Sequence, residues 1–244
     1  MTSLPELFLW SARMAGVSMA CVGFELVKEL PRLALWRSGD RRLSLATVHA
    51  NQLLAAFFGV LGLSFVVWPD SLFLGGAFVA VLVVFYFVVF FRPFGDGSDL
   101  MLIVVLTCLG TLQLMPTAWM RLVVEWCLAG NVCFAYWWSG AAKMRLRAWR
   151  TGRQIALICN SPRVGTRGIA WQLLDRPALP WLAAWGTMLL EVSCPLFLAV
   201  GGWPFVVWAA AAFVMHLSIA FIMGLGRFTW SFGAGLLAML AVRL

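Results

Sequence analysis

The chain has 244 residues, of which 63% are hydrophobic and only 11% are charged, and its mean hydropathy is +0.92. A soluble protein of this length needs many more polar residues to cover its surface, so a soluble fold is excluded. The net charge of +8 does not indicate nucleic-acid binding, because the basic residues follow a topological pattern, and we expect no nucleic-acid partner.

Eight apolar stretches are each close to the roughly 20 residues that a helix needs to cross a bilayer. They lie near residues 6–29, 46–68, 71–91, 100–116, 119–142, 180–200, 203–223 and 228–242. Unbroken runs such as VAVLVVFYFVVFF lack the alternation of a membrane β-barrel. The sequence therefore predicts an all-α, polytopic membrane protein: a single domain over 1–244, with about eight transmembrane helices in one bundle.

The basic residues predict how this bundle sits in the membrane. Fifteen of the 18 lysines and arginines lie in the loops after the first, third, fifth and seventh stretches. The positive-inside rule places these loops in the cytoplasm and both termini outside, and we expect a bacterial inner membrane. Membrane lipids with anionic headgroups are the expected partners, at about 1 kcal/mol per basic residue near the surface.

The longest connection, 143–179, predicts a cytoplasmic loop with structure of its own. The segments RAWRTGRQIALI and RGIAWQLLD each place Trp and aliphatic residues among arginines. That composition favours short helices that lie flat in the headgroup region. The six cysteines form no CxxC or CxxH pair, so neither a structural disulfide nor a metal site is expected.

Ionisable residues inside the predicted spans are the candidate functional residues. Each costs about 2.5–3.5 kcal/mol at mid-membrane on insertion scales, so each needs a partner or a purpose. Arg13 and Glu191 have no charged neighbour in their own spans that would pair with them, and His49 and His216 are the only histidines. The alternative for any of them is a packing role, with its polar atoms satisfied across helices.

Lys143 ends the fifth stretch and is open to two interpretations. Cys133, Tyr136, Gly140 and Lys143 recur at spacings of three and four residues, so they share one helix face, which we expect to point into the bundle. A lysine in dry surroundings at the end of such a face is able to act as a base. Alternatively, Lys143 is the first of the cytoplasmic basic residues that set the topology.

The order of motifs along the chain resembles the HTTM family, the membrane domain shared with vitamin K-dependent gamma-carboxylase. The resemblance rests on SARMAGVSM with Arg13, YWWSGAAKMRLRAW with Lys143, LLEVSCPLFL with Glu191, and FVMHLSIAFIMGLGRFTW with His216. In the carboxylase, the lysine that resembles Lys143 deprotonates reduced vitamin K. The resemblance thus implies Lys143 as a base, with His216 and Glu191 as catalytic partners, and a quinone or hydroquinone as cofactor.

Arg13, Tyr136 and His49 are the residues that we expect to contact the ligand. Glutamate carboxylation itself is not expected, because GDGSDLML lacks the catalytic histidine that the carboxylase has there. The large lumenal domain is also absent from these 244 residues, and the charge pattern places Lys143 at the cytoplasmic side. The family instead suggests redox-linked modification or maturation of a peptide.

Two functions of different classes follow. The first is a membrane protein that binds a quinone or other lipid-like ligand and acts on it through Lys143. The second is a non-catalytic accessory subunit that assembles with other membrane proteins through its polar residues. A transporter is disfavoured, because no pair of Gly- or Pro-broken spans recurs in the two halves.

Overall fold

The computed structural model describes residues 6–36, 45–69, 73–90, 97–115, 117–160, 176 and 178–243, and all regular elements in these ranges are helices. Five helices are long and apolar enough to cross a membrane: α1 (Glu6–Trp36), α2 (Leu45–Val67), α4 (Gly97–Leu114), α5 (Ala118–Arg145) and α11 (Gly202–Met223). Helices α9 (Ala178–Val192) and α10 (Cys194–Val200), bent by 46°, make a sixth span if they cross together. A helical membrane protein is therefore confirmed, whereas the count of about eight spans stays a prediction.

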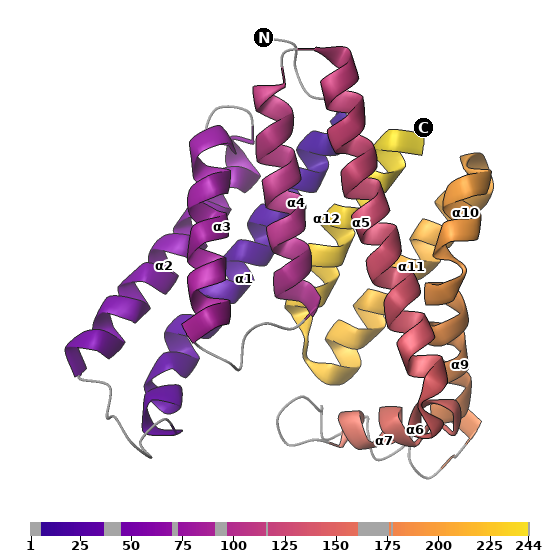
Figure 1. Cartoon of the computed structure of the whole chain (residues 1–244). Helices are drawn as coiled ribbons and strands as arrows, with labels where there is room; N and C mark the ends of the chain where they lie inside the picture. Colours follow the sequence, from indigo (N-terminus) through magenta and orange to yellow (C-terminus); the bar gives the residue numbers. More distant parts are fainter. Residues whose placement is uncertain are drawn as a thin grey trace.

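Two further helices of 18 residues, α3 (Phe73–Phe90) and α12 (Gly226–Arg243), complete the bundle. In Figure 1, α1 and α12 run through its middle, with α2 and α3 on one side and α9, α10 and α11 on the other. Two hydroxyl contacts join the central pair: Ser11 Oγ donates to the carbonyl of Ala234 at 2.8 Å, and the hydroxyls of Ser18 and Ser231 are 2.6 Å apart. Such buried hydrogen bonds between helices are typical of membrane bundles.

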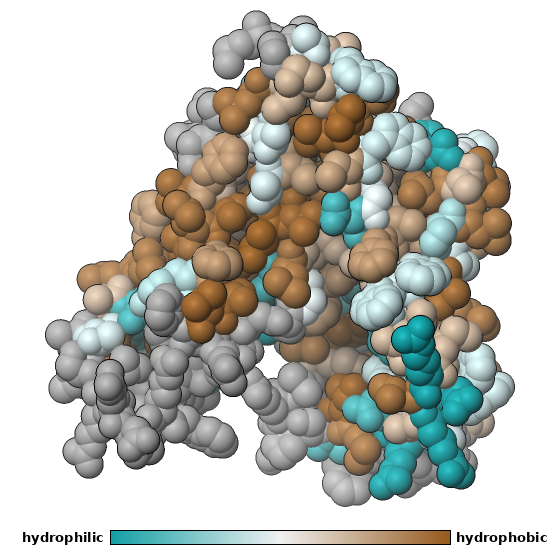
Figure 2. All heavy atoms as spheres, in the orientation of Figure 1, coloured by the Kyte–Doolittle hydropathy of each residue, from teal (hydrophilic) through white to brown (hydrophobic). Residues whose placement is uncertain are grey.

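Large apolar side chains cover much of the outer surface. Leu53 is 73% exposed, Val207 65% and Phe221 74%. Figure 2 shows hydrophobic residues over the middle of one face and hydrophilic ones gathered near the end where α5 meets the short helices. Exposed apolar area on this scale is stable only in contact with lipid or another protein.

The first two helices pack with their backbones almost touching, and glycine makes this possible. A Cβ added at Gly62 would lie 2.5 Å from the carbonyl oxygen of Gly16, and one at Gly23 would lie 2.6 Å from that of Ala55. Because lipid supplies no hydrophobic drive for helix association, close packing of small residues holds membrane helices together. The contact between α1 and α2 therefore depends on these glycines.

The connection after α5 contains the two short helices α6 (Arg147–Arg150) and α7 (Arg153–Cys159), which lie across the end of the bundle in Figure 1. Helical structure was predicted for this segment. The indole nitrogen of Trp185 on α9 donates to the carbonyl of Arg150 at 3.1 Å, which fixes the connection to α9. The second predicted interfacial helix, RGIAWQLLD, lies outside the described residues.

We expect Gly62→Val to weaken the contact between α1 and α2 and to lower the free energy of unfolding by about 1–3 kcal/mol, the usual cost of overpacking. The melting temperature of the purified protein in detergent measures this effect. The control is Gly186→Ala, because a Cβ at Gly186 has no atom within 4 Å among the described residues. Equal melting temperatures for the two variants would contradict the packing argument.

Candidate functional site

Lys143 lies in the last turn of α5 and binds a carboxylate on α9. Its Nζ donates to both oxygens of Glu191, at 2.5 and 2.6 Å, and to Ser139 Oγ at 2.7 Å. The side chain of Lys143 is 19% exposed and that of Glu191 only 8%. The two residues are 48 positions apart in the chain, so the fold brings them together.

Two features of the sequence allow this pairing. Gly140 lets α5 approach α9, since a Cβ there would lie 2.9 Å from both Glu191 Cβ and the backbone nitrogen of Val192. Pro195 has no amide hydrogen and its ring would clash with the carbonyl four residues earlier, so the helix breaks near Ser193 and bends by 46°. The carbonyl four residues before Pro195 belongs to Glu191, which therefore sits at the break.

The surroundings of the pair limit its contact with water. The ring of Trp149 on α6 lies 5.3 Å from Lys143 Nζ and shields it from one side. Burial removes the water that would stabilise two separate charges, so each charge depends on its partner for stabilisation.

A second polar pair, Tyr136 and His216, joins α5 to α11. The Tyr136 hydroxyl and His216 Nε2 are 2.8 Å apart, and both residues are buried. His216 stacks on Phe232 with ring centroids 4.4 Å apart, and Tyr136 meets the edge of Trp208 at 5.3 Å.

His216 also has a buried polar atom without a hydrogen bond. Its Nδ1 has no partner among the described residues. Buried polar atoms in native proteins nearly always have a partner, and an orphan is often explained by a water or a ligand. His216 thus retains one position for a donor or acceptor that the chain itself does not supply.

An apolar pocket of about 130 Å³ lies close to Glu191, between α7, α9 and α11. Its lining includes Cys159 of α7, Ala183 and Thr187 of α9, and Ile222 of α11. Thr187 is four residues before Glu191 on the same face of α9, so about one helical turn separates the pocket from the carboxylate. Burial raises the pKa of the Cys159 thiol, which makes this thiol a poor nucleophile.

The predicted site residues divide into two groups. Lys143 and Glu191 meet directly, as do Tyr136 and His216. Arg13 instead lies 4.6 Å over the ring of Trp10 on its own helix, and α1 begins at the end of the bundle opposite to the end of α5 (Figure 1). His49 is exposed, and its Nδ1 is 3.1 Å from Gln52 Oε1 on α2. The structure therefore does not bring Arg13 and His49 to Lys143.

Sequence reasoning did not select two residues that shape the site. Ser139 lies one turn before Lys143, and its spacing of four was the signal that could have identified it as a partner. Trp149 belongs to the segment RAWRTGRQIALI, for which only a helix in the headgroup region was predicted. Similarly, Arg227 was counted as a loop charge, but it is buried with its Nη1 3.7 Å from Asp99 Oδ1.

No family model, no curated protein and no solved structure matches this chain. The resemblance to the HTTM family thus rests on the short motifs quoted above and stays a prediction.

Replacing either member of the ion pair is expected to leave the other charge buried and uncompensated. We expect Lys143→Met or Glu191→Gln alone to destabilise the protein by about 3 kcal/mol, and the double variant by much less than twice that amount. Melting temperatures of the three variants in detergent give the coupling between the residues. Additive losses would show that the two side chains do not act as a pair.

Proposed function

We propose that this chain is an inner-membrane protein of eight spans that binds a quinone, a hydroquinone or another lipid-like ligand with an ionisable hydroxyl. The observation that carries this proposal is the buried Lys143–Glu191 pair beside an apolar pocket. An acid–base pair and an apolar surface are the two features that such a ligand requires. Arg13 and His49 have no part in this site.

The proposed topology has both termini outside and the 143–179 loop in the cytoplasm. The distribution of Lys and Arg supports it, as does the position of α6 and α7 across one end of the bundle in Figure 1. In this arrangement Lys143 and the pocket lie at the cytoplasmic side of the membrane. A lipid-soluble ligand would reach them from the bilayer.

The pocket suits part of such a ligand. Its lining is almost entirely hydrocarbon, with the Thr187 and Ser218 hydroxyls as polar exceptions, and the Ser218 hydroxyl is already used by the carbonyl of Val214. Pockets that enclose a drug-sized ligand measure about 300–1,000 Å³. A pocket of about 130 Å³ therefore takes one ring or a short run of chain, while the remainder stays in lipid.

The chemistry proposed for the chain is removal of a proton from the ligand hydroxyl. Glu191 takes a proton from Lys143, and Lys143 Nζ in its neutral form then accepts the hydroxyl proton. Ser139 holds the amine in place, and Trp149 limits the access of water. If the ligand is a reduced quinone, its deprotonated form gives up its electrons to dioxygen more readily. Coupling of that oxidation to a peptide fits redox-linked modification or maturation, as the resemblance implies.

A non-catalytic accessory subunit is the second candidate, and one observation favours it. The Lys143–Glu191 pair joins α5 to α9 with two short hydrogen bonds, which is also what a purely structural cross-link requires. In that case replacement of Lys143 by a neutral residue would impair assembly, and there would be no catalytic activity to lose.

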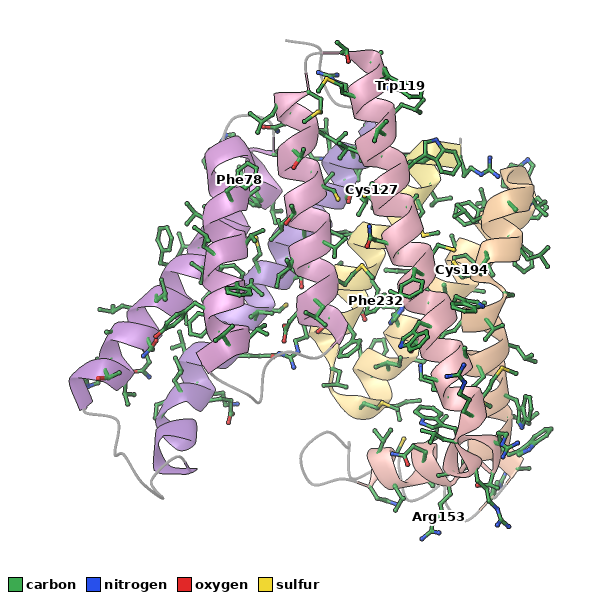
Figure 3. All side chains as sticks on the ribbon, viewed as in Figure 1. Phe78, Trp119, Cys127, Arg153, Cys194 and Phe232 are labelled. Atoms are coloured by element: carbon green, nitrogen blue, oxygen red, sulfur yellow. The ribbon has the colours of Figure 1, made fainter. Side chains whose placement is uncertain are left out.

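Oxygen uptake by the purified protein supplied with a reduced naphthoquinone tests the first candidate. We expect uptake by the wild type and its loss, by a factor of about 10²–10⁴, in Lys143→Ala, because general bases typically contribute that much. Arg153→Gln is the matched control, since it removes an exposed basic residue from the same connection (Figure 3). Equal uptake in wild type and Lys143→Ala, with equal melting temperatures, would rule out Lys143 as the base.

The pocket is tested separately, through binding. Thr187→Phe places a ring in the pocket, and we expect it to weaken naphthoquinone binding by about tenfold, which corresponds to 1.4 kcal/mol. Quenching of tryptophan fluorescence measures the affinity. Trp149 and Trp185 report on the pocket because they pack against the buried cluster that contains its lining residue Cys159. Leu53→Phe on the distant α2 surface is the control, and an unchanged Kd in Thr187→Phe would place the ligand elsewhere.

A further inference from the structure

A polar side chain lies on the outer surface of α5 at the middle of its length. Asn131 is the fourteenth of the 28 residues of α5 and is exposed. Its Nδ2 donates to the carbonyl of Cys127 at 2.8 Å. Its Oδ1 receives no hydrogen bond from the residues that the structure describes. The Nδ2 also lies 3.6 Å from Cys127 Sγ, which is a weak acceptor. The carboxamide oxygen is therefore unused among these residues, and one donor hydrogen is bound only weakly.

Asn131 belongs to a continuous row of exposed residues on α5, which we call the Asn131 stripe. Its members recur at helical spacings of three and four: Val123, Cys127, Gly130, Asn131, Phe134 and Trp138. Val123 is 50% exposed, Phe134 58% and Trp138 51%. A Cβ at Gly130 would meet no described atom within 4 Å, which leaves a notch in the stripe. Figure 3 shows Cys127 on the face of α5 that is turned to the viewer.

This combination is unfavourable in lipid and favourable against another helix. Hydrocarbon offers no hydrogen-bond partner, so a free carboxamide at mid-membrane carries a penalty. Glycine and asparagine are residue types that membrane helices use where they meet, the first for close approach and the second for hydrogen bonds between helices. A spacing of four and three residues is also the spacing that keeps two helices in contact along a seam.

We propose that the Asn131 stripe is the interface between two copies of this chain, related by a twofold axis along the membrane normal. Such an axis places two parallel α5 helices side by side, with both Asn131 side chains at the same depth. The carboxamide is self-complementary: each Oδ1 accepts from the partner's Nδ2, whose second hydrogen exchanges its weak contact with Cys127 Sγ for this bond. A different partner would have to bring its own polar group to this depth, whereas a second copy does so by symmetry.

The interface is independent of the proposed function. Lys143 and Glu191 lie on the side of α5 that faces α9, and Lys143 is three turns further along the helix than Asn131. Loss of quinone activity would therefore leave the dimer intact, and loss of the dimer is expected to leave the Lys143–Glu191 pair in place.

Disulfide cross-linking in native membranes tests the interface, because Cys127 is exposed within the stripe. Copper phenanthroline, which oxidises two neighbouring thiols to a disulfide, is expected to give a product of twice the 27.0 kDa chain mass. Cys127→Ala should abolish this product, whereas Cys159→Ala, which removes a buried thiol, should not. Absence of the product from membranes that contain folded protein, or a Cys127 adduct of any other mass, would overturn the proposal.

The role of Asn131 is tested by energy transfer between labelled chains in liposomes. We expect Asn131→Leu to weaken dimerisation about tenfold, because two symmetric hydrogen bonds are lost. Asn131→Gln, which keeps the carboxamide, should retain most of it, and Leu53→Ala on the exposed face of α2 should leave it unchanged. Equal dimerisation of Asn131→Leu and wild type, with equal melting temperatures, would refute the proposed pairing.

Discussion

The close approach of α5 and α9 at Gly140 is the constraint on which the candidate site depends. It brings Lys143 Nζ to 2.5 and 2.6 Å from the two oxygens of Glu191 and removes water from between them. Without that approach, a lysine at the end of a span would extend into the headgroups like any other anchor. The pair that results is costly to separate, because either charge alone would be buried without a partner.

The pocket and the ion pair share helix α9. The pocket takes its α9 lining from Leu179 to Thr187, and the rest from α7 and the last turns of α11. The fold therefore places an acid–base pair and an apolar surface within about one helical turn of each other. Pro195 and Gly140 support this arrangement although neither carries any chemistry.

Burial and exposure separate the polar residues of α5 into different roles. Tyr136 and Lys143 face other helices and are hydrogen-bonded within the chain, whereas Asn131 faces outward with unused hydrogen-bonding capacity. A polar group at mid-membrane requires a partner in either case. On the inner face the partner is another helix of the same chain, and on the outer face it has to come from another molecule.

The sequence by itself determined that the chain is a helical membrane protein, predicted helical structure after α5, and selected Lys143, Glu191, Tyr136 and His216 as candidate site residues. Composition and helical period are local properties, and they follow from hydrophobicity and charge alone. Which partner each residue has was decided only by the tertiary structure. The pairing of Lys143 with Glu191 and of Tyr136 with His216 depends on how α5, α9 and α11 pack, over 48 and 80 residues of chain. Arg13 and His49 are equally polar in the sequence but lie elsewhere in the fold. The sequence could not separate them from the site residues, because the packing that selects neighbouring helices leaves no periodic signal in the chain.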